Sequence, residues 1–159
     1  MYCPYVYQKG AGPIVALVKE NGEIYMRYDI KSGEGSYFAS IIIDKPTYYI
    51  SESEAKSAVN KKVNEAKSSV RSGGYIEGTD WKKVDVRNRT INGKDCVELT
   101  FSGGSYVGKL AELKYCYIKD ENVVYELKFR ADDAIYEDMD ENFFEPVLKS
   151  FKTSVSLKE

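Results

Sequence analysis

VDVRNRTINGKDCVELTF, residues 84–101, contains two segments of alternating polar and apolar side chains on either side of Asn92-Gly93. Asparagine followed by glycine is typical of a two-residue hairpin turn of type I′, because both central residues of that turn require a positive φ. A two-residue turn determines the register of the two strands, so Arg87 is expected opposite Glu98. The same register pairs Val84 with Phe101, Val86 with Leu99 and Arg89 with Cys96.

Two more strand-like segments follow this hairpin and extend it to a four-stranded meander. The four strands are expected near residues 82–91, 94–102, 109–118 and 123–131. Facing of apolar side chains and pairing of opposite charges choose one register, and a shift by one residue would move every side chain to the other face. The pairs predicted across the second and third turns are Cys96 with Cys116, Glu98 with Lys114, Leu99 with Leu113, Lys114 with Glu126, Glu112 with Lys128, Leu113 with Leu127 and Tyr115 with Tyr125.

The meander, within residues 81–131, is therefore expected to have an apolar face and a charged face. The apolar face would contact the core and comprises Val84, Val86, Val97, Leu99, Phe101, Leu113, Tyr115, Leu127 and Phe129. The charged face is expected to be solvated and is the candidate interaction face, comprising Arg87, Arg89, Glu98, Glu112, Lys114, Glu126 and Lys128. Each glutamate on it has a cationic neighbour, so ion pairs between strands are favoured over acid–base catalysis by paired carboxylates.

The first half of the chain predicts three strands, within residues 14–44, and then a helix. The strands are expected near residues 13–20, 23–30 and 37–44, with Asn21-Gly22 as a second hairpin turn. Ser51 and Glu54 form a capping box, which predicts a helix over residues 51–72 that ends at Gly73-Gly74. The apolar residues of this helix form one narrow stripe that would lie close to a sheet, namely Ala55, Val59, Val63, Ala66 and Val70.

The C-terminal segment, residues 136–152, has the apolar spacing of a helix. Pro146 has no backbone amide and crowds the turn before it, so it breaks or begins a helix. The segment is expected to form two short helices, or one that begins around Glu145, and to cover the core. Its apolar stripe comprises Tyr136, Met139, Phe143, Phe144, Val147, Leu148 and Phe151.

These patterns together predict a single α+β domain over residues 1–159. The expected architecture is an antiparallel sheet of about six to seven strands, with a helix after the third strand and a C-terminal helix. Residues 1–13 form an aromatic N-terminal segment.

The composition argues against several functional classes. The chain has no histidine, which removes the commonest general base and metal ligand, and its three cysteines are too few and too scattered for a zinc site. A net charge of −2 lacks the electrostatic footprint of a nucleic-acid-binding protein. No apolar run approaches the roughly 20 residues that span a bilayer. We therefore predict no cofactor, no metal, no nucleic acid and no transmembrane segment; the expected partner is a protein, and the oligomeric state stays open.

Two motifs that resemble ligand sites receive simpler interpretations. Gly103-Gly104 is interpreted as a hairpin turn rather than a phosphate-binding loop, since no helix start or lysine-serine pair follows it. The acidic stretch DDAIYEDMDEN, residues 132–142, lacks the glycine of a calcium loop. We interpret it as acidic residues near the beginning of a helix, where the helix dipole favours them.

Cys96 and Cys116 are the candidate disulfide or thiol pair. Directly opposed cysteines on antiparallel strands lie near the separation that a disulfide requires. The bond would form in an exported protein, whereas two free thiols would remain in a reducing cytoplasm. The start of the chain does not resemble a signal peptide, which favours the cytoplasm; a trimmed leader or a lipoprotein anchor would favour the opposite compartment, and both stay open.

The order of these elements resembles the PsbP-like family. The resemblance covers roughly the C-terminal half and the capped helix, and it rests on VVYELKFRA at residues 123–131 followed by NFFEPVLKSFK at residues 142–152. This fold is shared by an extrinsic subunit of photosystem II, a Ran-binding import factor and uncharacterised bacterial proteins, often lipoproteins. The resemblance implies a non-enzymatic binding, adaptor or structural module. It transfers no site residue, because the members bind unrelated partners.

Two other functions remain as alternatives to a binding module. The first is a domain that binds a small hydrophobic ligand through the aromatic N-terminal segment, with Tyr2, Tyr5 and Tyr7. The second is an enzyme of unknown class, which the absence of histidine and of a metal-binding pattern disfavours.

Overall fold

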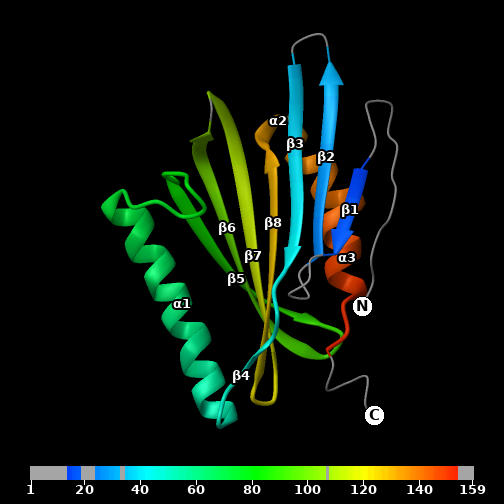
Figure 1. The fold of residues 1–159 in the computed structure, drawn as a ribbon. Helices are drawn as coiled ribbons and strands as arrows, with labels where there is room; N and C mark the ends of the chain where they lie inside the picture. The colour runs from blue at the N-terminus through cyan, green and yellow to red at the C-terminus, as the bar shows by residue number, and fades with distance from the viewer. Residues whose placement is uncertain (1–13, 19–23, 33–34, 107, 154–159) are drawn as a thin grey trace.

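The computed structural model describes the backbone of residues 14–18, 24–32, 35–106 and 108–153, and the side chains of residues 39–105 and 108–153. Its centre is an antiparallel sheet with the strand order β1-β2-β3-β8-β7-β6-β5, and β4 pairs with the beginning of β8 (Figure 1). The strands are β1 (Ile14–Val18), β2 (Ile24–Ser32), β3 (Gly35–Ile43), β4 (Thr47–Tyr48), β5 (Lys83–Ile91), β6 (Lys94–Tyr106), β7 (Lys109–Asp120) and β8 (Val123–Asp132). The helices are α1 (Glu52–Ser72), α2 (Asp133–Met139), the π-helix η1 (Asp140–Phe144) and α3 (Glu145–Ser150).

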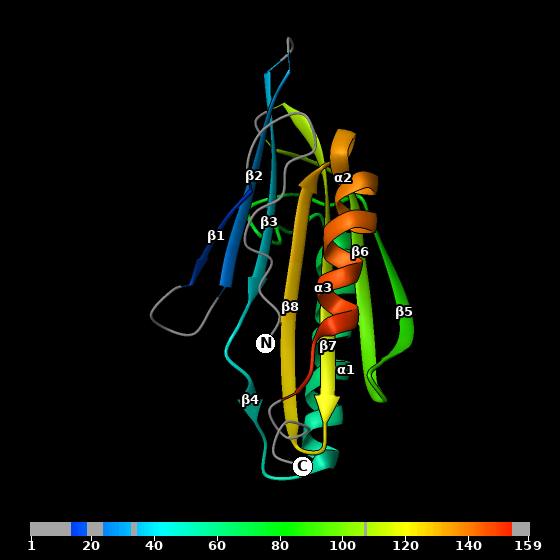
Figure 2. The same cartoon turned by 90° about the vertical axis from the view of Figure 1, so that its right-hand side faces the viewer.

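Helices cover both faces of the sheet. α1 packs on one face, and the C-terminal segment formed by α2, η1 and α3 packs on the other, here called the C-terminal face (Figures 1 and 2). The predicted α+β class, with an antiparallel sheet, a helix after the early strands and a C-terminal helix, is confirmed. The two-residue strand β4 was not predicted. That residues 1–159 form a single domain stays a prediction.

The hairpin of β5 and β6 has the predicted turn and register. Asn92 and Gly93 both have positive φ, at 47° and 79°, as a type I′ turn requires. The ladder pairs Arg87 with Glu98, and the other three predicted pairs of this hairpin are also observed. Local turn chemistry therefore determines this part of the sheet.

α1 begins and ends where its caps predict. The Ser51 hydroxyl accepts a hydrogen bond from the Glu54 amide at 3.1 Å, and the Glu54 carboxylate accepts one from the Ile50 amide at 3.3 Å. Gly73 adopts a left-handed conformation with φ of 76°, which residues other than glycine rarely adopt. The helix buries Ala55 and other small residues of its narrow stripe against the sheet.

The C-terminal segment is helical from Asp133 to Ser150, and thus begins earlier than Glu145. Its middle turn is the π-helix η1, which directly precedes Pro146 in the first turn of α3. Proline cannot donate the hydrogen bond of an α-helix, and its ring crowds the preceding turn. The wider π-turn lets the chain stay helical across this position.

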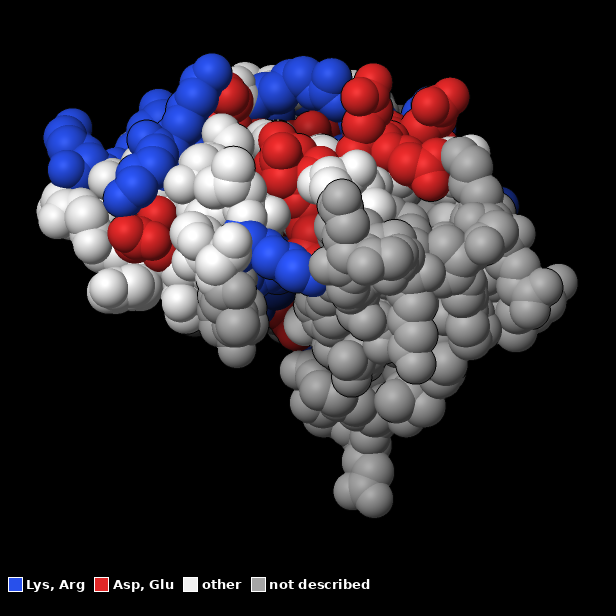
Figure 3. All heavy atoms as spheres, turned by 90° about the horizontal axis from the view of Figure 1, so that it is seen from above, with Lys and Arg blue, Asp and Glu red and all other residues white. Residues whose placement is uncertain are grey.

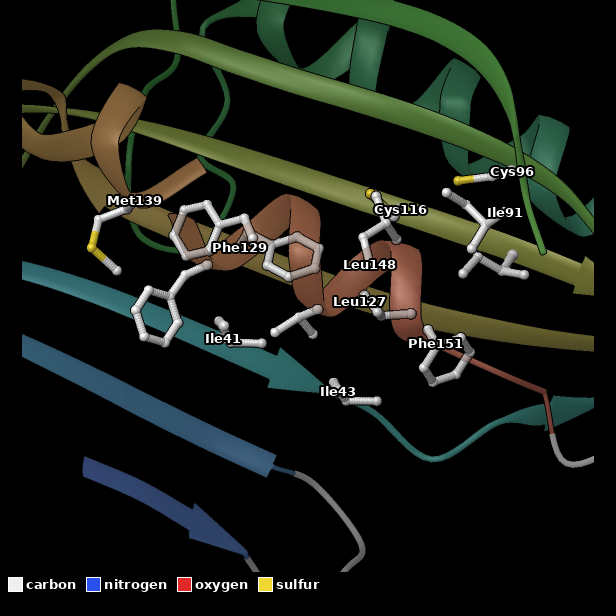
Figure 4. Close-up of a cluster of buried hydrophobic side chains, with 14 of the residues drawn as sticks. Ile41, Ile43, Ile91, Cys96, Cys116, Leu127, Phe129, Met139, Leu148 and Phe151 are labelled. Carbon is white, nitrogen blue, oxygen red and sulfur yellow. The ribbon is translucent and has the colours of Figure 1, made fainter. Parts of the chain in front are cut away.

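Each face of the sheet has its own apolar core. Leu127 and Phe129 of β8 pack with Leu148 and Phe151 on the C-terminal face (Figure 4). The core on the α1 face comprises Ala55, Val59, Ala66, Trp81, Leu99, Phe101, Ala111, Leu113, Tyr115, Tyr117 and Val124. The predicted burial of Phe101, Leu113, Leu127 and Phe151 is confirmed. The prediction of one apolar face is wrong, because Leu127 and Phe129 lie on the opposite face from Leu99.

The predicted register of β6 and β7 is wrong by two residues. Glu98 lies opposite Cys116 rather than Lys114, and the faces of these residues are unchanged because the shift is even. β6 continues to Tyr106 through Gly103-Gly104, which was predicted to be a turn. The ladder shifts between Phe101 and Gly104, where a β-bulge places Gly103 at φ of 75°.

The predicted register of β7 and β8 is wrong by three residues. Lys114 lies opposite Phe129, and Tyr117 lies opposite Glu126. An odd shift exchanges the two faces of β8, so Leu127 and Lys128 lie on the faces opposite to those predicted. Alternation misleads here because both strands are buried on both faces, where apolar residues occur on either side.

The N-terminal strands form the other edge of the sheet. β1 pairs with β2 and β2 with β3, both antiparallel, and β3 pairs with β8. The turn predicted at Asn21-Gly22 lies outside the described residues.

Candidate functional site

The charged face predicted to be solvated lies beneath the C-terminal segment at its centre. Glu98 of β6 and Lys114 of β7 are only 6% and 3% exposed. Glu98 accepts hydrogen bonds from Arg87 at 3.1 Å and Arg89 at 2.9 Å. The prediction of solvation is wrong here because the helical segment folds over these strands and supplies further acidic side chains.

Those acidic side chains are Asp140 of η1 and Glu145 of α3. Arg89 donates to both carboxylate oxygens of Glu145, at 2.7 and 2.9 Å. Lys114 donates to Asp140 at 2.5 Å and to Glu145 at 2.9 Å. Together with Arg87 and Glu98, these residues form what we call the ion-pair network, which joins β5, β6 and β7 to the C-terminal segment.

The network holds Arg89, Lys114 and Glu145 in their charged forms. The pKa of Glu145 is lowered to about 2, mainly by its hydrogen bonds from Arg89 and further by the one from Lys114. Burial acts in the opposite direction but is outweighed. The bond to Glu145 raises the pKa of Arg89 despite its partial burial. Burial alone would lower the pKa of Lys114, but its bonds to Asp140 and Glu145 raise it. Such a carboxylate is a poor proton donor or acceptor near neutral pH, so the network is suited to attachment rather than acid–base chemistry.

The other residues of the predicted interaction face do not join this network. Lys128 faces α1, where its Nζ lies 3.3 Å from Glu77, 3.4 Å from Asp44 and 3.7 Å from Glu126. Glu112 is half-buried near α2. Its pKa is raised, mainly by burial and to a smaller extent by the negative charges of α2 and η1. The seven predicted residues are therefore divided between the two faces of the sheet.

A second polar cluster lies on the α1 face. The Tyr115 hydroxyl donates to Glu77 at 2.7 Å, and burial together with this bond raises the pKa of Tyr115. Arg130 lies over the ring of Trp81, 5.5 Å from its centroid, and donates to the Thr79 hydroxyl at 3.0 Å. These groups satisfy one another, so we interpret the cluster as part of the packing between the sheet and the loop after α1.

An open cavity of about 460 Å³ lies over the ion-pair network. Besides the network residues, its walls include Thr100, Tyr136 and Lys149. Tyr136 is only 8% exposed, and its hydroxyl has no hydrogen-bond partner within the part of the chain that the structure describes. Buried hydroxyls are rarely left in this state, so this group requires an explanation.

A second cavity, of about 660 Å³, lies between α1 and the edge of the sheet, and we call it the α1 groove. α1 contributes Lys56 and Asn60, and the strands contribute Asn88 and Val97. The nearest edge is β5, which ends the strand order and has β6 as its one neighbour among the described strands. Its Val86 is 38% exposed, so an apolar side chain borders a free strand edge.

Cys96 and Cys116 are both buried free thiols on the C-terminal face (Figure 4). The ladder pairs Cys96 with Ile118 and Cys116 with Glu98, so the two cysteines lie diagonally and not directly opposite as predicted. The two-residue difference between the predicted and the observed register of β6 and β7 accounts for this placement. The pKa of Cys116 is raised, mainly by burial and further by a hydrogen bond with Cys96. A disulfide between them stays a prediction.

The acidic stretch at residues 132–142 forms α2 and the start of η1. Seen from the end of the molecule at which α2 lies, acidic side chains gather on one side (Figure 3). No group of three or more Cys, Asp or Glu side chains within residues 39–105 and 108–153 is arranged to hold a metal ion.

In the described part of the chain, no helix is both long and apolar enough to cross a membrane. Tyr2, Tyr5 and Tyr7 of the alternative ligand site lie outside the described residues.

Sequence analysis did not identify Asp140, Glu145 or Tyr136 as partners of the charged face. A signal for the acidic pair was present, because Arg87, Arg89 and Lys114 outnumber Glu98 on adjacent strands. Cations in excess on a buried face require acidic residues from elsewhere in the chain. No comparable pattern marks Tyr136, whose spacing is that of a core residue.

Comparison with known proteins gives no family for this chain. No family model matches it, and no curated protein matches it. Among solved structures, it resembles LpqN of Mycobacterium tuberculosis, a protein described as involved in cell envelope biogenesis. The identity is 15% and the TM-score 0.47, over 91% of this chain and 85% of that chain. A likeness at this level assigns neither a family nor a function, and the PsbP-like resemblance stays a prediction.

Proposed function

We propose that this chain is a non-catalytic binding module that recognises an extended segment of a partner protein along the free edge of β5. The PsbP-like resemblance implies a module of this kind, and the edge strand with its adjoining groove suggests how the partner is held. The partner segment pairs with the β5 backbone as an added strand, and one of its side chains enters the α1 groove.

The observation that carries this proposal is the free edge of β5 beside the α1 groove. β5 is nine residues long, and most of its residues are exposed. A strand edge presents backbone N–H and C=O groups that another strand satisfies. Alternate side chains of an added strand point to the same face, so every second residue of the partner would face α1.

The chemistry of the groove favours an amphipathic segment. Val97 of the groove and the exposed Val86 on the β5 edge supply apolar surface. Lys56, Asn60 and Asn88 of the groove supply hydrogen-bonding groups. A segment of alternating apolar and polar residues meets both requirements. The ion-pair network supports a non-catalytic role, because its carboxylates already accept hydrogen bonds from Arg89 and Lys114.

Selection from a phage-displayed library of random peptides tests this function. We expect enrichment of peptides with alternating apolar and polar residues, which bind the chain as extended strands. Val86→Lys places a charge at the β5 edge, and Asn60→Trp fills the α1 groove. Both variants should therefore no longer bind the selected peptides.

Leu110→Ser is the matched control, because Leu110 is also an exposed apolar residue but lies on β7, away from the edge strand β5. It should bind the selected peptides like the parent chain. Failure to enrich any peptide, or equal binding by Val86→Lys and the parent, would contradict the proposed function.

A further inference from the structure

We propose that the cavity over the ion-pair network binds a small oxyanion, in the form of a carboxylate or a phosphoryl group. The cavity lies on the C-terminal face and involves neither Val86 nor Asn60, so this inference is independent of peptide binding at β5. Its basis is the hydrogen-bonding capacity that the walls of the cavity leave unused.

Each carboxylate in the cavity wall already accepts at least one charge-assisted hydrogen bond. Glu98 accepts from two arginines, and Glu145 accepts from Arg89 with both of its oxygens and from Lys114. Asp140 accepts from Lys114. A ligand that mainly donates hydrogen bonds would compete with these strong charge-assisted bonds.

The same wall also presents donors that the described residues leave unused. The Tyr136 hydroxyl is buried and has no partner among the described residues. Arg87 bonds to Glu98 through Nη2 alone, and its side chain is 61% exposed. Lys149 lines the same cavity. A ligand oxygen that accepts from Tyr136 would satisfy a hydroxyl that the protein leaves unpaired.

The charges of the wall favour the same class of ligand. Four cations, Arg87, Arg89, Lys114 and Lys149, face three anions, Glu98, Asp140 and Glu145, which leaves a net charge of +1. The planar guanidinium of Arg87 is suited to carboxylate and phosphate oxygens, which it binds with two parallel hydrogen bonds. The cavity volume of about 460 Å³ is sufficient for a small metabolite that carries such a group.

Titration with two simple probes tests this inference. Inorganic phosphate and succinate are added separately to the full chain at constant low ionic strength, and binding is followed by calorimetry and by NMR of ¹⁵N-labelled protein. We expect saturable binding of at least one probe, with amide shifts around Tyr136 and Lys149. Binding of phosphate alone identifies a phosphoryl ligand, and binding of succinate alone identifies a carboxylate.

Two variants connect binding to this cavity. Tyr136→Phe removes only the hydroxyl and should weaken binding about tenfold, the loss expected for a hydrogen bond to a charged group. Its melting temperature should equal or exceed that of the parent, because the lost hydroxyl has no protein partner. Arg87→Gln should also weaken binding about tenfold. Lys61→Gln, an exposed cation on α1, should leave affinity unchanged.

The inference is wrong if neither probe binds saturably, or if Tyr136→Phe binds with the affinity of the parent chain. It is also wrong if Lys61→Gln weakens binding as much as Arg87→Gln, because the anion would then respond to overall charge alone. Peptide selection on β5 would be unaffected by any of these results, so the two proposals fail separately.

Discussion

Arg89 on the edge strand β5 and Glu145 at the start of α3 are joined by two hydrogen bonds of 2.7 and 2.9 Å, although 56 positions separate them in the chain. This pair attaches the C-terminal segment to the sheet edge. Both side chains are mostly buried, so the pair is shielded from solvent more than a surface ion pair.

Removing the carboxylate of Glu145 should destabilise the protein strongly. Glu145→Gln leaves Arg89 and Lys114 with one acidic partner fewer in a largely buried site, which should lower the free energy of unfolding by about 3 kcal/mol. Urea denaturation followed by circular dichroism measures this. Glu141→Gln, at an exposed position of η1, is the control, and equal midpoints for the two variants would contradict the structural role of the network.

The same residue should make stability depend on pH in the acid range. The pKa of Glu145 is about 2 in the folded chain and about 4.3 when unfolded. Because the folded value is lower, the ionised carboxylate stabilises the fold above about pH 4.3, and this contribution of roughly 3 kcal/mol is lost as the pH falls toward 2. The stability difference between the parent chain and Glu145→Gln should therefore shrink over this range, and a constant difference would refute the prediction.

Leu127 should contribute strongly to the core on the C-terminal face. It is fully buried among Phe129, Leu148 and their neighbours, so Leu127→Ala should lower the free energy of unfolding by about 2–5 kcal/mol through lost burial and a cavity. Leu110→Ala at an exposed position should change it little. Thermal melting of both variants checks this, and a Leu127→Ala midpoint within a degree of the parent would exclude it.

The bulge in β6 should be sensitive to any side chain at Gly104. A Cβ at this position would lie 2.6 Å from the ring of Trp81 and 2.5 Å from the Thr79 methyl group. Gly104→Ala should therefore destabilise the protein by about 1–3 kcal/mol through overpacking. Ser105→Ala in the same strand is the control. Chemical denaturation that gives equal stability for both variants would show that Trp81 moves freely.

Cys96 and Cys116 should react as buried thiols. Both lie beneath the C-terminal segment, and burial raises the pKa of Cys116, so little reactive thiolate is present at neutral pH. We expect neither to react with Ellman's reagent until the protein is unfolded, when both should titrate. Rapid reaction of Cys116 in the native protein would contradict this placement, and the loss of two titratable thiols after unfolding without reductant would indicate a disulfide within the chain.

Several elements followed from the sequence because their causes are local. The turn at Asn92-Gly93 requires positive φ at two adjacent residues, and this requirement fixes the pairing of Arg87 with Glu98. The bounds of α1 follow from the hydroxyl of Ser51 and the left-handed conformation of Gly73. Such interactions span three or four residues, so the order of amino acids was enough to predict them.

Tertiary structure alone decided the register of β6 with β7, the register of β7 with β8, and the burial of the charged face at its centre. Both faces of β7 and β8 are buried, so alternation did not show which side of β8 carries Leu127 and which carries Lys128. The burial of Lys114 depends on Asp140 and Glu145, which reach it only after the C-terminal segment folds over the sheet. Ion pairs and packing between distant segments depend on where the backbone places them, and a linear pattern of residues does not contain that information.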